Sequence, residues 1–167
     1  TIMANYILEG IYFYSGFMFF YNLERNGKMP GSAQEIRYIN RDENTHLWLF
    51  RNIIKELQKE EPGLFNDDLK KELVDMMKKG VKNEIAWGHY VIGDNIQGIN
   101  KKLIEDYIKY LGNLRLSAIG LPKIFDGYDE NPALWVDVLA DANSVKTDFF
   151  EAKSTAYAKA ATLIDDL

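Results

Sequence analysis

The 167-residue chain contains no cysteine, only four prolines and only two histidines. Without cysteine it has no disulfide and no thiolate ligand, so any metal must be held by carboxylate oxygen and imidazole nitrogen. The net charge of −5 gives no electrostatic reason to expect nucleic acid as a partner. No glycine-rich phosphate-binding loop is present. The lack of cysteine fits a reducing compartment, and we expect a cytoplasmic protein.

Apolar residues make up 47% of the chain and aromatic residues 13%, which is enough for one domain with a packed core. No alternating strand pattern persists, and no internal repeat is evident. We therefore predict an all-α fold over residues 1–140, followed by an irregular, flexible tail over 141–167. The expected helices cover residues 2–23, about 33–60, 66 or 67 to about 93, 101–119 and 133–140.

The helix boundaries rest on turn and capping signals. A turn cluster over residues 26–32 separates the first two helices, and Ser32 with Glu35 forms a capping box that predicts a helix start near Ala33. Gly80 lies inside the third helix, where we expect a weak point rather than a certain break.

Residues 2–23 are long and apolar enough to be mistaken for a membrane span. Glu9 is their only acidic residue, and a carboxylate in mid-span would be costly in lipid. The segment also lacks the basic start and cleavage site of a signal peptide. We expect a buried core helix and no membrane, so Glu9 needs a partner inside the fold.

Glu43 and His46 lie three residues apart, which places both on one helix face and lets them reach one point. A short turn makes their helix the antiparallel neighbour of the helix that carries Glu9. A lone Glu beside a Glu-x-x-His pair is half the ligand set of a carboxylate-bridged di-metal site in a four-helix bundle. Such donors suit iron or manganese. A Glu-x-x-His pair also arises often on surface helices, so a solvated Glu and an ordinary His remain the alternative.

The second histidine, His89, does not extend this set. The nearest acid before it, Glu84, is five residues away and about 140° around the helix. We predict that His89 has a structural role, either at the helix surface or in the core.

The chain contains five segments that together resemble the second half of the radical-generating small subunit of class I ribonucleotide reductase: LEGIYFYSGF, IRYINRDENTH, YIKYLGNLRLSAIGLP, NPALW and DFFEAKSTAY. They occur in the family's order over nearly the whole chain. The resemblance implies the C-terminal half of a ferritin-like bundle with a di-metal centre, with iron as the expected metal and manganese or a mixed centre as alternatives. It also implies an oxygen-activating radical generator that supports reduction of ribonucleotides to deoxyribonucleotides.

The resemblance further implies roles for single residues. Glu9, Glu43 and His46 would be metal ligands. Asp42 would hydrogen-bond to a histidine ligand of the missing half and would link the metal to the radical-transfer route. Tyr157 would relay the radical toward the large subunit, on which the tail would dock as a peptide that orders on binding.

Three apolar residues complete the implied site. Phe13, Phe17 and Ile39 resemble the apolar pocket that shields the radical. They can serve at the same time as ordinary core residues.

A complete small subunit has an earlier half with a second lone acid, a second Glu-x-x-His pair and usually the tyrosine that stores the radical. This sequence contains none of these, so we expect an N-terminal half, a large catalytic subunit and a dimer of complete small subunits as partners. Thr1 stands only eight residues before Glu9. We therefore expect a segment of a longer product that was split, cleaved or spliced.

Two other classes of function fit the same residues. Two copies of the chain could complete one metal site in a symmetric homodimer with oxidase or iron-handling activity. The chain could also be a non-catalytic helical interaction module, in which these polar residues only cap helices or face solvent.

Overall fold

The computed structural model describes residues 1–141, and every regular element in that range is a helix. This confirms the predicted all-α class. The predicted boundary between the bundle and the tail stays a prediction, because residues 142–167 lie outside the described range. The elements are α1 (Ile2–Ile7), the π-helix η1 (Leu8–Tyr12), α2 (Tyr14–Arg25), α3 (Pro30–Glu60), α4 (Asp67–Val91), α5 (Lys101–Ala118) and α6 (Leu134–Ala140).

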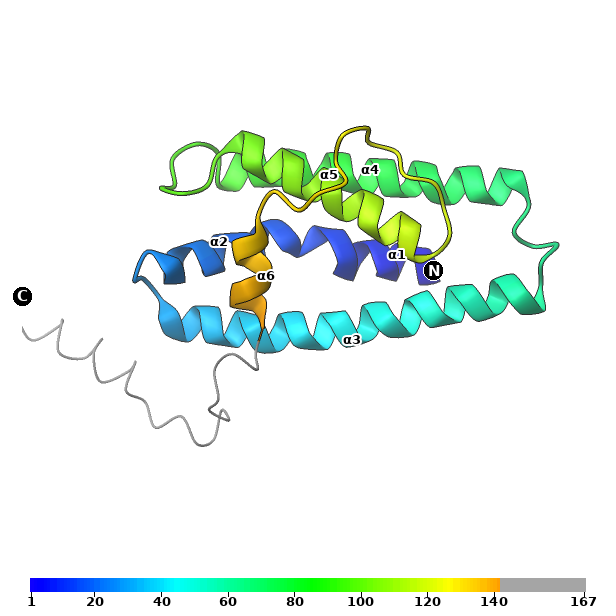
Figure 1. Cartoon of the computed structure of the whole chain (residues 1–167), viewed down its shortest axis with the longest axis horizontal. Helices are drawn as coiled ribbons and strands as arrows, with labels where there is room; N and C mark the ends of the chain where they lie inside the picture. Colours follow the sequence, from blue (N-terminus) through cyan, green and yellow to red (C-terminus); the bar gives the residue numbers. More distant parts are fainter. Residues whose placement is uncertain (142–167) are drawn as a thin grey trace, which may run out of the picture.

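The helices form three layers (Figure 1). The segment α1–η1–α2 lies in the middle and contacts α3 on one side and α4 on the other, while α5 packs beside α4 and also contacts η1. The short helix α6 crosses at one end, where it contacts α2 and α3. The middle layer is therefore the element on which the rest of the bundle is assembled.

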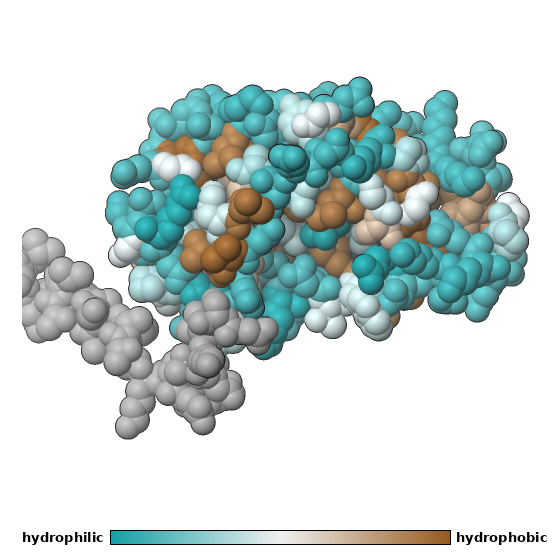
Figure 2. All heavy atoms as spheres, in the orientation of Figure 1, coloured by the Kyte–Doolittle hydropathy of each residue, from teal (hydrophilic) through white to brown (hydrophobic). Residues whose placement is uncertain are grey.

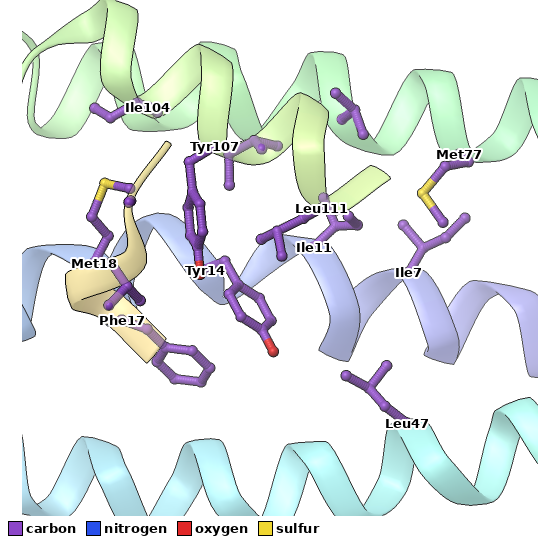
Figure 3. Close-up of a cluster of buried hydrophobic side chains, with 14 of the residues drawn as sticks. Ile7, Ile11, Tyr14, Phe17, Met18, Leu47, Met77, Ile104, Tyr107 and Leu111 are labelled. Atoms are coloured by element: carbon purple, nitrogen blue, oxygen red, sulfur yellow. The ribbon is translucent and has the colours of Figure 1, made fainter. Parts of the chain in front are cut away.

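The core lies between these layers (Figure 3). Fully burying one large apolar side chain stabilises a fold by roughly 1.5 to 3 kcal/mol, so these contacts supply most of the stability of the bundle. The middle layer contributes Ile7, Ile11, Phe17 and Met18, which face Met77 of α4, Ile104 and Leu111 of α5, and Leu47 of α3, all of them buried.

The first predicted helix is interrupted, and the expectation of one continuous helix over residues 2–23 was wrong. The structure has a π-helix over Leu8–Tyr12 and a break at Phe13 before α2 begins. A π turn widens the helix locally by one residue. Periodicity could not reveal it, because apolar residues occupy nearly every face of this segment.

The start of α3 also differs from the prediction. The helix begins at Pro30, after Met29 in the left-handed region with φ 49°, and no side chain caps it. Proline suits the first position of a helix because its φ is already fixed and its missing N–H is not needed there. The expected capping box of Ser32 and Glu35 was therefore wrong, because Ser32 already lies within the helix.

Two polar contacts fix the register between α2 and α3. Arg37 donates two hydrogen bonds to the Glu24 carboxylate, each 2.7 Å long, in the bidentate geometry that gives strong and directional pairing. Asn40 Nδ2 donates to the buried Tyr21 hydroxyl at 3.1 Å. Burial raises the pKa of Tyr21 to about 12, so the hydroxyl stays protonated. These contacts hold α3 in place one turn before Glu43.

Gly80 does not break α4, which runs from Asp67 to Val91. A Cβ atom at Gly80 would lie 2.6 Å from Ile7 Cγ2, and one at Gly88 would lie 2.8 Å from Ser15 Oγ. Both distances are shorter than real Cβ atoms show to neighbouring atoms. The two glycines therefore allow α4 to approach the middle layer closely.

The outer surface shows hydrophilic residues with apolar side chains between them (Figure 2). Within the part of the chain that the structure describes, none of the helices combines the length and the apolar character needed to cross a bilayer.

Candidate metal centre

Glu9, Glu43 and His46 converge on one point between two layers of the bundle. Glu9 lies in η1, and the other two lie one turn apart on α3. His46 Nδ1 is 3.0 Å from Glu43 Oε2 and 3.3 Å from Glu9 Oε2. One ligand atom from each residue lies within 4.8 Å of the others. The structure thus brings together the three residues that the spacing predicts would meet.

The electrostatics of the cluster favour a bound cation. Burial raises the pKa of Glu9, the charge of Glu43 adds to the rise, and His46 opposes it. The hydrogen bond to Glu43 raises the pKa of His46 in turn. Both carboxylates are mostly buried, with side chains 17% and 14% exposed, so their repulsion is poorly screened. A divalent cation between them would remove this repulsion.

A buried oxygen in the cluster also fits a metal. Among the described residues, Glu9 Oε2 has no hydrogen-bond donor of adequate geometry, although it is shielded from solvent. A buried acceptor without a hydrogen bond is costly, and a metal ion would satisfy this oxygen. Two carboxylates and one imidazole are a donor set suited to iron or manganese. The His46 side chain is 50% exposed, so the cluster opens toward the outside of this chain.

The π-helix that carries Glu9 is held from α5. The Arg115 guanidinium donates to the Gly10 carbonyl at 3.4 Å and to the Tyr14 hydroxyl at 2.7 Å. A Cβ atom at Gly10 would lie 3.0 Å from Leu47 Cδ2, so this glycine lets α3 come close. π turns of this kind are frequent at functional sites, where they redirect a side chain.

The other predicted site residues are not members of the cluster. Asp42 is exposed and pairs with Arg41 at 3.2 Å. The Phe13 and Phe17 rings lie 6.1 Å apart, and Phe17 is buried, while Ile39 is 45% exposed. Tyr157 lies outside the described residues. The apolar pocket that the resemblance implies therefore stays a prediction.

His89 has the structural role that its position predicts. Its Nε2 atom lies 3.0 Å from the Lys101 carbonyl oxygen, across the connection between α4 and α5. With a proton on Nε2, the ring ties the end of one helix to the start of the next.

Sequence reasoning missed Glu84, which it used only to exclude a metal role for His89. Glu84 is 2% exposed, and its Oε1 atom accepts a hydrogen bond from the Ser15 backbone N–H at 3.0 Å. Burial raises the pKa of Glu84 to about 7, although hydrogen bonds from Ser15 oppose the rise. A signal was present, because Gly80, Glu84 and Gly88 recur every four residues and share one helix face.

Replacing Glu84 with glutamine tests this burial through the pH dependence of stability. The raised pKa means that the folded state binds the proton more tightly, so its stability falls as pH rises from about 4.5 to about 7. We expect Glu84→Gln to be more stable than the unmodified protein by about 2 to 3 kcal/mol at pH 8, and far less so at pH 5. Urea unfolding at both pH values measures the difference. Glu56→Gln is the exposed control on α3, and parallel pH profiles for all three proteins would contradict the expectation.

Comparison with known proteins agrees with the fold. The family model for the ribonucleotide reductase small chain matches residues 1–132. The ribonucleoside-diphosphate reductase subunit beta of Treponema pallidum (strain Nichols) is 61% identical over 167 residues, which are 99% of this chain and 48% of that protein. The protein of the same name from Halalkalibacterium halodurans is 45% identical over 95% of this chain and 46% of its own length.

Solved structures agree as well. The ribonucleotide reductase R2 subunit from Clostridium botulinum matches with a TM-score of 0.81 and 55% identity, covering 83% of this chain and 44% of that one. The chain thus spans about half the length of the relatives that it matches. The fold is the ferritin-like helical fold of these R2 subunits. The chain belongs to the ribonucleotide reductase small-chain family.

Proposed function

We propose that the chain is part of the small subunit of a ribonucleoside-diphosphate reductase, acting as a di-metal, oxygen-activating radical generator. The observation that carries this proposal is the convergence of Glu9, Glu43 and His46 in a member of this family. Nucleotide reduction itself would take place on a large catalytic subunit. The expected products are deoxyribonucleotides for DNA synthesis.

In this proposal the three converging residues hold metal, and iron is the preferred ion. The carboxylates supply hard, negatively charged oxygen donors, and the half-exposed His46 supplies a neutral nitrogen donor. The bound metal would supply dioxygen activation. Residues of this chain orient the proposed ligands: Arg115 holds the Gly10 carbonyl beside Glu9, and Glu43 holds the His46 ring.

The ligand set of this chain is half of a di-metal set, so we propose that a companion polypeptide supplies the other half. The exposed stripe on α3 supports this, because Ile39, Asp42, His46 and Leu49 are spaced by three or four residues and are all exposed. Large apolar residues beside a half-exposed ligand are typical of a surface that another chain covers. The N-terminal half of a small subunit is the proposed occupant.

Metal analysis with and without that N-terminal half tests the proposal. We expect the chain alone to load iron poorly and the one-to-one complex to load about two ions, since a carboxylate di-metal site draws on ligands from four helices. A chain that loads iron alone as a symmetric dimer would favour the homodimer instead. Loading in neither preparation would favour the non-catalytic module. Failure of mass spectrometry to find a companion in an active preparation would contradict the split arrangement.

The proposed relay through Asp42 and Tyr157 has a separate test. We expect removal of residues 157–167 to leave iron loading unchanged and to abolish turnover with the large subunit, because the proposed relay and docking segment would be lost. Tyr90→Phe is the control, since Tyr90 is 84% exposed on α4 and has no proposed role. Turnover that survives the truncation would contradict the relay.

Two further parts of the proposal rest on the family resemblance and the composition. Complete small subunits would form dimers, and the absence of cysteine fits the cytoplasm. Size measurement of the complex with its companion would test the first.

A further inference from the structure

The junction between η1 and α2 contains a backbone group that the helix cannot satisfy by itself. The first N–H groups of an α-helix have no carbonyl partner within the helix, and α2 begins at Tyr14. At a helix start on the surface, water or a capping side chain would accept them. Ser15 is buried, so water cannot serve here. The Glu84 carboxyl accepts the hydrogen bond instead, with Oε1 3.0 Å from the Ser15 nitrogen.

The close packing of α4 against the middle layer places the Glu84 carboxyl at the junction between η1 and α2. Gly80 and Gly88 lie one turn before and one turn after Glu84, and a Cβ atom at either would collide with the middle layer. With hydrogen atoms there, α4 comes close enough for a side chain at Glu84 to reach the backbone of the junction. These three residues of α4 thus form the surface against which the interrupted helix packs.

The junction controls which way Glu9 faces. If the π turn closed into a regular α-helix, the Ser15 N–H would donate to the Ile11 carbonyl and would no longer need Glu84. Taking up the extra residue of the π turn would rotate Glu9 relative to α2 by about 100°, the rotation of one residue in an α-helix. An external acceptor for the Ser15 N–H therefore favours the interrupted form over the regular one.

We propose that Glu84 is a positioning residue, which holds the break between η1 and α2 and thereby keeps the Glu9 carboxylate turned toward Glu43 and His46. Glu84 makes none of the contacts of the cluster itself and acts only through Ser15. The importance of Glu84 for metal binding rests on the proposed function. Its role in stabilising the break between η1 and α2 does not.

The test uses amide hydrogen exchange of the peptide around Ser15, measured on the protein purified with its companion polypeptide. Glu84→Ala removes the acceptor, and exchange at Ser15 should accelerate by about tenfold, the change that loss of one buried hydrogen bond produces. Glu84→Gln keeps an oxygen acceptor and should restore slow exchange. Glu84→Leu fills the same space without an acceptor and should exchange as fast as the alanine variant, so it replaces that variant if alanine prevents folding.

Val81→Ala is the matched control. Val81 is buried on the same helix but packs against Gly112 of α5, so this variant loosens α4 without touching the junction. Ser15 exchange should stay at the original rate in this control after correction for global stability. Unchanged exchange in Glu84→Ala, or equal acceleration in Val81→Ala, would overturn the assignment.

Titration with Fe(II) alone measures the consequence for the cluster. Affinity should fall about tenfold in Glu84→Ala and Glu84→Leu and stay near the original value in Glu84→Gln and Val81→Ala. Equal affinity in all four variants would overturn the link between the break and Glu9. If the unmodified protein binds no Fe(II) even in complex with the proposed N-terminal half, the proposed function fails. The exchange measurement at Ser15 still tests the role of Glu84 in that case.

Discussion

Replacing Glu43 with alanine is expected to reduce iron loading to the background level. Glu43 is the link between the other two members of the cluster, since it holds His46 Nδ1 at 3.0 Å and its charge acts on Glu9. Its loss removes one of the two carboxylates and leaves His46 without its partner on the same helix. Losing one donor and the orientation of a second is expected to weaken binding more than a hundredfold, beyond the 10- to 100-fold typical of losing a supporting contact. Metal analysis after incubation with Fe(II) and the proposed N-terminal half measures the effect.

Two controls separate this effect from a loss of folding. Glu56→Ala removes an exposed acid from the same helix and should load iron normally. His46→Ala removes a proposed ligand whose side chain is half exposed, so the fold should tolerate the change while loading falls. Retained loading in Glu43→Ala at unchanged helicity would exclude this cluster as the metal site.

The proximity of the three residues could be predicted because it depends on local features. A spacing of three residues fixes Glu43 and His46 on one helix face, and a short turn makes the helix of Glu9 an antiparallel neighbour. An acid isolated in an apolar segment needs a partner wherever that segment is buried. Together these features predict from the sequence alone that the three residues lie close together.

The π turn and the role of Glu84 could not be predicted in the same way. The spacing of Gly80, Glu84 and Gly88 marks one face of α4, but it does not reveal that this face contacts the π-turn region, about 70 residues earlier in the chain. The start of α3 was wrong for a different reason, since Pro30 after a left-handed Met29 outweighs the capping signal of Ser32. The sequence therefore predicts which residues meet better than it predicts the backbone that holds them.

Asn113 is expected to be the most sensitive polar residue of the fold outside the cluster. It is buried on α5, and its side-chain amide makes four hydrogen bonds to the segment between α5 and α6. Its oxygen accepts from the Ile124 and Phe125 N–H groups at 2.9 and 3.1 Å. Its nitrogen donates to the Phe125 and Tyr128 carbonyls at 2.7 and 3.1 Å. One amide thus determines the path of this connection.

Asn113→Ala should lower the free energy of unfolding by about 2 to 4 kcal/mol, because four backbone groups lose a partner and the side chain leaves a cavity. Thermal unfolding should show a Tm lower by roughly 5 to 15 °C for a chain of this size. Asn5→Ala, at an exposed position on α1, is the control and should change stability very little. A loss below about 1 kcal/mol would mean that water replaces these hydrogen bonds at little cost.

The same variant tests whether α6 and the cluster are independent of each other. The connection leads into α6, which is held on α2 and α3 partly by Arg25 stacked over the Trp135 ring at 4.0 Å. The cluster of Glu9, Glu43 and His46 lies on η1 and the middle of α3, whereas the hydrogen bonds of Asn113 go to the segment between α5 and α6. Asn113→Ala should therefore loosen α6, seen as faster amide exchange over residues 120–140, while the protein that stays folded loads iron normally. Loss of iron loading in that folded fraction would show that α6 and the cluster are coupled through α2 and α3.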